Sequence, residues 1–202
     1  PKQADCGYPF KMLCGAAVAW RLVEALYRAE GIPKEEVLDL AEFAAVATVG
    51  DIMELRGENR ALVRYGLKRL EQTENLGYRA LIRVNGLTGK RLTAYHIGFV
   101  IGPCINASGR LDTARRALNL LGARDQEEAE TLAGDLKALN DSRKALTVKG
   151  TEEARRQIEE TDLKLDRVLV VYLPECHESL AGIIAGRIRE QYYRPCFVLT
   201  DG

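Results

Sequence analysis

The chain has 202 residues, with 29 basic and 29 acidic side chains, so its formal net charge is zero. Hydrophobic residues make up 47% and charged residues 29%, which are ordinary values for a globular protein and exclude a largely disordered one. No stretch approaches the roughly 18–20 unbroken apolar residues of a membrane span, no signal peptide opens the sequence, and the balanced charge excludes a strongly basic nucleic-acid coat protein.

The first two-thirds of the sequence predict helices. Apolar residues recur there at intervals of three and four, as on the buried face of an amphipathic helix, and Gly, Pro and polar clusters separate the segments. We expect Gly102 and Pro103 to end one of these helices and residues 106–110 to form a polar turn. The predicted helices are residues 15–29, 34–47, 59–72, 78–84, 92–101 and 113–121.

A much longer helical pattern follows, capped by Asp125 and running over about residues 126–160. At ~1.5 Å per residue it would span roughly 50 Å, a length typical of a helix that joins two bodies. The alternative is two consecutive helices of one bundle, interrupted at Gly150.

The last part of the sequence predicts a βαβ unit. Residues 167–173 and 196–200 are short apolar runs typical of buried strands, and residues 180–192 between them predict a helix. The predicted fold class is therefore α/β, with a mostly helical first part, a long connecting helix and the start of a second α/β domain.

The zero net charge hides an uneven distribution. Residues 77–121 hold seven basic residues and one acidic residue, whereas the segments on both sides are net acidic. This positive segment either attracts a polyanion, because phosphate binding depends on local charge, or is a solvated helix face. Its basic residues are Arg79, Arg83, Lys90, Arg91, Arg110, Arg115 and Arg116.

The five cysteines form no Cys-x-x-Cys pair, and neither they nor the two histidines have the spacing of a zinc-finger site. An odd number of cysteines without a disulfide framework indicates a reducing compartment. We therefore predict a cytoplasmic protein whose thiols are mostly packed.

Three places carry more polar chemistry than packing requires. Asp51 stands where a helix should end, so it is either a cap or turn residue or a carboxylate ligand for a hard divalent cation. Asn106 and Arg110 lie in the positive segment, where they could hold an anion. His177 follows a predicted strand, where α/β folds bind ligands, and Arg187 lies in the next helix; both could equally be ordinary surface residues.

Taken together, these segments resemble the RecJ family, the single-stranded-DNA-specific exonucleases of the DHH phosphoesterase superfamily. The resemblance is colinear from end to end and is most specific in residues 96–111, which read His-Ile-Gly-Phe-Val-Ile-Gly-Pro-Cys-Ile-Asn-Ala-Ser-Gly-Arg-Leu. The other matching stretches are residues 1–3 (Pro-Lys-Gln), 5–10 (Asp-Cys-Gly-Tyr-Pro-Phe), 13–19, 47–51 (Ala-Thr-Val-Gly-Asp), 177–187 (His-Glu-Ser-Leu-Ala-Gly-Ile-Ile-Ala-Gly-Arg) and 194–195 (Arg-Pro).

The resemblance implies a domain organisation. Residues 1–122 would be the C-terminal part of a DHH domain, residues 123–165 the connecting helix, and residues 166–202 the incomplete start of a DHH-associated nucleic-acid-binding domain. It also implies a 5′→3′ exonuclease of DNA repair and recombination, in which two Mn²⁺ or Mg²⁺ ions generate a hydroxide nucleophile and stabilise the leaving oxygen.

Residue roles and partners are carried over in the same way. Asp51 would be a catalytic metal ligand, while Asn106, Arg110, His177 and Arg187 would bind nucleic acid. The implied partners are single-stranded DNA and, for the longer protein, a single-strand-binding protein or a helicase, with no membrane.

The sequence departs from the family pattern in two respects. Cys104 occupies a position where the family signature has an arginine, which removes one expected nucleic-acid contact. No Asp-His-His or Asp-x-Asp motif is present, so of the family's metal ligands only Asp51 is found. We therefore expect an internal fragment of a longer nuclease, inactive by itself.

Three other functions remain open. The first is a DHH phosphodiesterase acting on oligonucleotides or cyclic dinucleotides, against which the 96–111 signature argues. The second is a non-catalytic DHH-type scaffold, against which the presence of Asp51 argues. The third is a helical protein-interaction module, which salt-sensitive binding of single-stranded DNA, abolished by Arg110→Ala, would contradict.

Overall fold

The structure is a computed structural model that describes residues 1–111 and 113–201, apart from the side chain of Arg110. It confirms the α/β class, because the described residues are mostly helical and carry a small parallel sheet. In chain order the elements are α1 (Gly15–Ala29), α2 (Lys34–Asp39), α3 (Ala41–Gly50), α4 (Gly57–Glu71), α5 (Leu76–Val84), α6 (Ala94–His96), the π-helical turn η1 (Ile97–Ile101), α7 (Gly102–Leu111), α8 (Arg115–Leu121), α9 (Gln126–Glu160), the 3₁₀ turn η2 (Asp162–Leu165), β1 (Leu169–Tyr172), α10 (Glu178–Tyr192) and β2 (Cys196–Leu199).

Helix α3 lies between α1 and α4, and the three helices together form a hydrophobic cluster. Its small residues Ala41, Ala44 and Ala45 are buried and let the neighbouring helices approach closely. The approach is closest at Gly66 of α4, where a Cβ atom would lie 2.3 Å from the Cβ of Ala45. The alanine-rich sequence therefore serves close helix packing.

The single helix predicted over residues 34–47 is instead two helices, α2 and α3, which meet at Leu40. The backbone N–H of Leu40 donates to the carbonyl of Val37, three residues back, which tightens and ends α2. The change of direction turns the alanines of α3 toward α1 and α4. Packing of the small residues thus overrides a helical pattern that runs through both segments.

Residues 94–111 form one continuous helical segment, so the predicted break at Gly102 and Pro103 and the turn at residues 106–110 are wrong. The segment passes from α6 through the π-helical turn η1 into α7. The N–H of Gly102 donates to the carbonyl of Ile97, five residues back, and this wider turn directly precedes Pro103, which has no N–H to give. A local π-turn therefore absorbs the proline without ending the helix.

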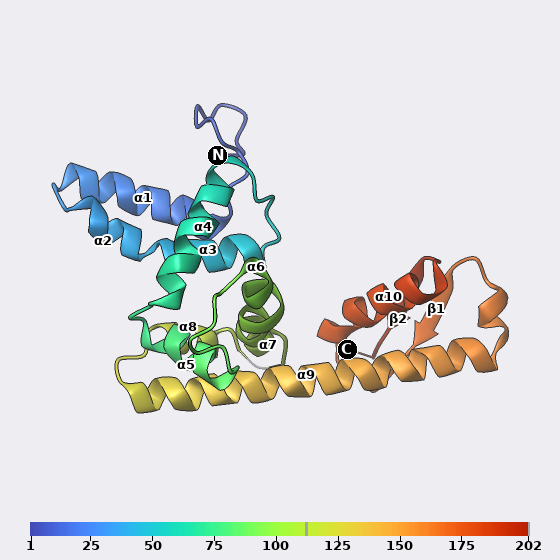
Figure 1. Ribbon diagram of the computed structural model, residues 1–202. Helices are drawn as coiled ribbons and strands as arrows, with labels where there is room; N and C mark the ends of the chain where they lie inside the picture. The colour runs from blue at the N-terminus through green and yellow to red at the C-terminus, as the bar shows by residue number, and fades with distance from the viewer. Residues whose placement is uncertain (112, 202) are drawn as a thin grey trace.

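Helix α9 is continuous over 35 residues, which excludes the two-helix alternative. The predicted cap is confirmed, because the Asp125 side chain accepts a hydrogen bond from the N–H of Glu128 at 2.8 Å. Near its start α9 buries Ala133 and Leu136 in a core shared with α5, α7 and α8, and near its end it buries Ile158 beneath the sheet. One helix thus underlies both parts of the molecule (Figure 1).

The predicted βαβ unit is confirmed. Strands β1 and β2 pair in parallel, with Leu169 opposite Cys196, and α10 connects them. Leu169 and Val171 face a buried cluster with α10 and the end of α9, whereas Val170 and Tyr172 are exposed on the other face. The alternation gives a sheet that is covered on one side by helices.

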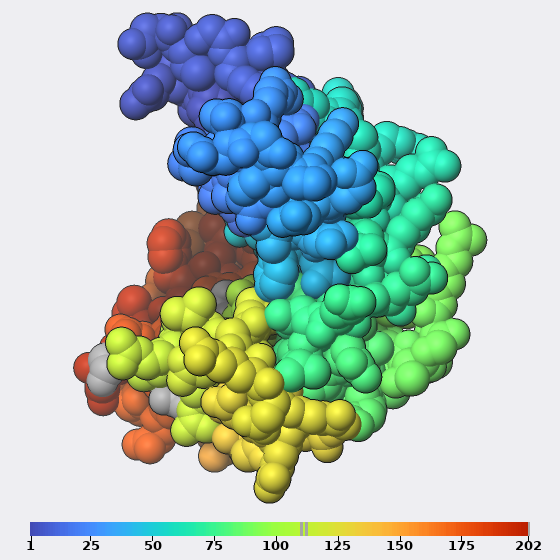
Figure 2. All heavy atoms as spheres, turned by 90° about the vertical axis from the view of Figure 1, so that its left-hand side faces the viewer, coloured from blue at the N-terminus to red at the C-terminus, as the bar shows by residue number. Residues whose placement is uncertain are grey.

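Residues 1–14 precede the first helix, and the beginning of this segment stands out beyond α1 and α2 in the space-filling view of Figure 2. They are tied to the body at Glu58 of α4, whose Oε2 accepts a hydrogen bond from the Tyr8 hydroxyl at 2.7 Å and pairs with Arg21 of α1 at 2.5 Å. Among the described residues, no helix has the length and apolar character needed to cross a bilayer.

Candidate nucleic-acid interface

Asp51 follows the last residue of α3, as the sequence indicates. Its backbone N–H donates to the carbonyl of Ala47 at 2.8 Å, and the N–H of Met53 donates to the carbonyl of Thr48 at 3.1 Å, so the chain reverses through Ile52 in the left-handed region (φ 54°). The backbone of Asp51 is therefore a helix cap. Its carboxylate is exposed and forms no hydrogen bond or ion pair within residues 1–111 and 113–201.

The described side chains do not by themselves fit a two-metal site. Two divalent cations need several carboxylate or imidazole ligands arranged around them. No group of three or more His, Cys, Asp or Glu side chains in the described part of the chain is placed to hold a metal ion. Asp51 offers one oxygen donor group, and no metal-assisted step follows from it alone.

Helix α7 presents the most specific part of the signature. Asn106 is exposed on it, and position 110 lies one turn further along, although the Arg110 side chain is outside the described residues. Ser108, which lies between them in the sequence, is buried, and its hydroxyl donates a hydrogen bond to the Ile105 carbonyl at 3.0 Å. A helix, not a loop, therefore carries this part of the signature, with Asn106 at its surface.

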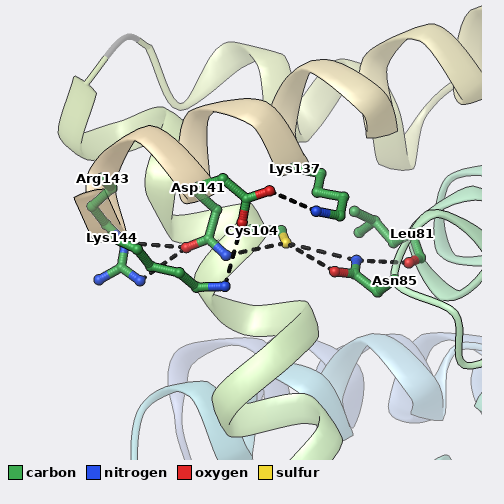
Figure 3. A network of polar contacts seen from close by, with 8 residues as sticks. Leu81, Asn85, Cys104, Lys137, Asp141, Arg143 and Lys144 are labelled. Carbon is green, nitrogen blue, oxygen red and sulfur yellow. Dashed lines mark hydrogen bonds and ion pairs between the residues drawn. The ribbon is translucent and has the colours of Figure 1, made fainter. Parts of the chain in front are cut away.

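Cys104, on the opposite side of α7, is fully buried where α5, α7 and α9 meet. Its Sγ accepts hydrogen bonds from Nδ2 of Asn85 and Nδ2 of Asn140, each at 3.7 Å (Figure 3). Oδ1 of Asn140 in turn accepts from Arg143, at 3.1 Å from Nε and 2.9 Å from Nη2. Burial raises the pKa of the Cys104 thiol, so it stays neutral and acts as a packing and hydrogen-bonding group.

The positive segment is partly neutralised by α9. Arg83 pairs with Glu130, and Arg116 pairs with Asp135 at 3.0 Å, so these two arginines anchor the long helix to the helical body. The other basic side chains of the segment that the structure describes are exposed and form no ion pair with the described residues, namely Arg79, Lys90, Arg91 and Arg115. These four remain free to meet an anion.

His177 caps α10 beside a groove of about 590 Å³. Its Nδ1 accepts a hydrogen bond from the N–H of Ser179 at 3.2 Å, so the neutral ring carries its proton on Nε2. The wall formed by α9 includes Lys149 and Gly150. The predicted position, after a strand and at the start of a helix, is confirmed, and Lys149 adds a cation that the pattern of the sequence did not single out.

Arg187 is not close to His177. It lies nearly three turns further along α10, roughly 15 Å at ~1.5 Å per residue, and its side chain is exposed. It forms no ion pair with any residue that the structure describes. The structure therefore separates these two predicted nucleic-acid ligands.

Two other pairs of predicted elements do come together. Helices α7 and α10 touch each other and both pack on α9, which places Asn106 and His177 on neighbouring elements (Figure 1). The end of α3 meets η1, because a Cβ at Gly98 would lie 3.6 Å from Cγ1 of Val49, two residues before Asp51. The helical segment 94–111, which contains the signature, thus connects the surroundings of Asp51 with the contact between the two parts of the molecule.

Tyr95 and Phe99 are surface residues that the sequence patterns missed. They are 63% and 69% exposed, and their rings stack with centroids 4.9 Å apart and planes inclined by 26°. The only indication of this exposed pair in the sequence was the spacing of two aromatic residues four positions apart in a helical segment. The same spacing also fits the buried face of a helix.

The fold and the surface define an α/β segment in which one long helix carries a helical body and a parallel βαβ unit, with Asn106 and His177 on the two helices where these parts touch. Segments of this kind are found in RecJ proteins. The single-stranded-DNA-specific exonuclease RecJ of Bacillus subtilis is 37% identical over 199 residues, and that of Thermus thermophilus is 40% identical over 190 residues.

Solved structures give the same relationship. The crystal structure of Thermus thermophilus RecJ in complex with Mg²⁺ matches 97% of this chain with a TM-score of 0.84 and 37% identity. The crystal structure of an exonuclease RecJ bound to manganese matches 97% with a TM-score of 0.83. Over its length the chain is therefore a relative of RecJ in sequence and in fold, which confirms the resemblance.

The match covers only part of each relative. It takes in 98% of this chain but 24% of the Bacillus subtilis protein, and 93% of this chain but 27% of the Thermus thermophilus protein. The two crystal structures are covered to 30% and 49%. No family model matches the chain.

Proposed function

We propose that this chain is part of a 5′→3′ exonuclease specific for single-stranded DNA. The observation that supports the proposal is the colinear match to RecJ relatives over 93–98% of the chain, together with the common fold at a TM-score of 0.84. The names of these relatives favour an exonuclease over a phosphodiesterase of dinucleotides and over a non-catalytic scaffold.

Within that proposal, one group of residues binds the DNA strand and another contributes to the metal site. Asn106 and Arg110 on α7 and His177 at the start of α10 bind the strand, and Arg187 extends the contact along α10. Asp51 contributes one carboxylate to a larger set of ligands for Mn²⁺ or Mg²⁺, the ions present in the related structures. A single carboxylate cannot hold two cations, so we expect the 202-residue chain alone to have no nuclease activity.

The remaining proposals come from the resemblance alone. The domain limits are residues 1–122, 123–165 and 166–202, with the strand bound between the first and the last. A role in DNA repair and recombination, a cytoplasmic location, and a single-strand-binding protein or a helicase as partners of the longer protein follow in the same way.

The test is binding of the 202-residue chain to a fluorescent oligo(dT) strand, measured by anisotropy at several salt concentrations. We expect salt-dependent binding that is weaker in Arg110→Ala, with the slope of log K against log[salt] smaller by about 0.7, because the variant neutralises one phosphate fewer. Arg155→Ala, which removes an exposed arginine of α9, serves as the control and should change neither quantity.

Two results would contradict the proposal. One is the absence of strand binding at low salt, which would favour a protein-interaction module. The other is an equal effect of Arg110→Ala and Arg155→Ala, which would reduce the binding to general surface charge. Measurable Mn²⁺-dependent degradation of the strand by the purified chain would overturn the expectation of inactivity.

A further inference from the structure

An aromatic platform lies on the surface of the helical segment 94–111, where the signature begins. Tyr95 of α6 and Phe99 of η1 are four residues apart, and their rings are stacked and both exposed. Large aromatic side chains are normally buried, since each removes a large apolar area from water. Two of them held together at the surface offer a flat face to a planar ligand.

The backbone beneath the platform is firmly held. Ile97 and Ile101, on the other side of the same turn, are fully buried in the hydrophobic core. Gly98 lies against Val49 at the end of α3. The two exposed rings therefore stand on a fixed turn, and π-helical turns of this kind are frequent at functional sites.

His96 adds a polar group beside the platform. Its ring meets Tyr95 edge to face, with centroids 5.9 Å apart, and its Nδ1 accepts a hydrogen bond from the backbone N–H of Thr93 at 3.1 Å. In the neutral ring this leaves the proton on Nε2, which has no hydrogen-bond partner among the described residues. A stacking face with a nearby N–H donor suits a heteroaromatic ring that carries acceptor atoms.

The charges that precede the platform in the sequence indicate the chemistry of the ligand. Lys90 and Arg91, which lead into α6, are both exposed and form no ion pair within the described chain. An apolar peptide would not use these cations, whereas a nucleotide needs both a surface for its base and a cation for its phosphate. The turn that carries the platform packs against the end of α3, because a Cβ at Gly98 would lie 3.6 Å from Cγ1 of Val49, two residues before Asp51.

We propose that Tyr95 and Phe99 form a stacking platform for an unpaired nucleobase of a single strand. The proposal rests on the function proposed above and adds to it the site that holds a base. Base stacking is tolerant of sequence, because every base has a π face, so the platform binds a strand without selecting its sequence.

The experiment compares two strands of equal length and charge, oligo(dT) and the same strand with abasic tetrahydrofuran sites in place of the bases. The 202-residue chain should bind the base-bearing strand more tightly. Phe99→Ala should weaken binding of oligo(dT) by roughly 5- to 150-fold, as expected when one base is no longer stacked, and should leave binding of the abasic strand unchanged.

Three variants provide the controls. Phe99→Trp keeps an aromatic face and should retain affinity for oligo(dT), which separates stacking from any effect on folding. Leu118→Ala truncates a comparably exposed side chain, 70% exposed on α8, and should change neither affinity. Lys90→Ala should weaken both strands equally, because phosphate is common to them.

The outcomes distinguish this proposal from the proposed function. If oligo(dT) binds but Phe99→Ala weakens both strands equally or neither, the platform is overturned while single-strand binding stands. If the wild-type chain binds neither strand at low salt, the proposed function fails and the platform fails with it.

Discussion

Glu42 is a carboxyl group buried where α3 meets the turn after α4. It is 5% exposed, and its Oε1 accepts a hydrogen bond from the Thr73 hydroxyl at 2.7 Å. Burial raises the pKa of Glu42, against the opposing effects of Thr73 and Arg69, and Asp39 raises it further. Tyr78 also faces this carboxyl, and its own pKa is raised by burial and by Glu42.

The raised pKa makes stability depend on pH in a definite direction. The folded chain holds the proton of Glu42 at pH values where the unfolded chain, with a pKa of about 4.3, has released it. The contribution of this carboxyl to stability is therefore full below the unfolded pKa and is lost as the pH rises through the folded pKa. We expect Glu42→Gln, relative to the wild type, to be more stable at pH 7 than at pH 4, as measured by urea unfolding.

The control for Glu42 is Glu152→Gln, which removes an exposed carboxylate of α9. Its free energy of unfolding should follow the wild-type pH dependence. Parallel curves for Glu42→Gln and the wild type would show that Glu42 does not carry the predicted proton.

The burial of Cys104 is a feature of a single residue that the family pattern did not predict. An arginine in the family pattern implies that this position faces nucleic acid, but the Cys104 side chain is buried between Asn85 and Asn140 and faces no solvent. The sequence could not show this, because the direction of position 104 depends on a helix that Gly102 and Pro103 seemed to exclude. In this chain Cys104 packs between α5, α7 and α9, and Asn106 is a signature residue that is exposed on α7.

At the scale of elements, the long and strongly patterned segments were predictable. Helix α9 begins at the residue after the expected cap, and α1 has the predicted limits, because capping and apolar spacing act locally. The junctions α2–α3 and η1–α7 were not predictable, since Leu40 and the π-turn respond to packing against other elements. Gly66 is a third such case, because only the contact of α3 with α4 reveals what it does.

Gly66 tests this contact directly. A Cβ there would lie 2.3 Å from the Cβ of Ala45 and 2.8 Å from the backbone oxygen of Ala41, which cannot move without shifting α3. We expect Gly66→Ala to lower the free energy of unfolding by about 1–3 kcal/mol, measured by urea denaturation.

Gly134 of α9 is the matched control, since a Cβ there meets nothing within 4 Å. Gly134→Ala should raise the free energy of unfolding by about 0.5–1 kcal/mol, because alanine is the better helix former. A change of the same sign in both variants would mean that helix propensity, and not the α3–α4 contact, decides the effect of Gly66.

At the scale of the whole molecule, α9 carries two hydrophobic clusters that, among the described residues, share no other element. Gly150 lies where α10 and the end of β1 rest on the long helix, and a Cβ there would lie 2.5 Å from Cδ1 of Ile184. The sequence left an interruption at Gly150 open as the alternative to one long helix, but the helix continues through it. The glycine instead lets the βαβ unit sit close to α9.

The contact at Gly150 can be measured with a double-mutant cycle. Gly150→Ala should cost the βαβ unit about 1–3 kcal/mol through overpacking against the Ile184 side chain, partly offset by a gain of about 0.5–1 kcal/mol for alanine over glycine in a helix, and Ile184→Val, which deletes Cδ1, should cost about 1 kcal/mol through a small cavity. Because the new methyl group meets the atom that Ile184→Val removes, the double variant should be destabilised by less than the sum of the two, by about 0.5 kcal/mol or more.

Hydrogen exchange of backbone amides provides the readout for this cycle, because it resolves the two clusters separately. Exchange should accelerate in β1, α10 and β2 in each single variant and remain unchanged in α5, whose core α9 reaches near its other end. Additive effects would mean that the Gly150–Ile184 contact does not set how closely α10 packs. Equal acceleration in α5 would mean that α9 makes the molecule a single cooperative unit, so that its two clusters do not open independently.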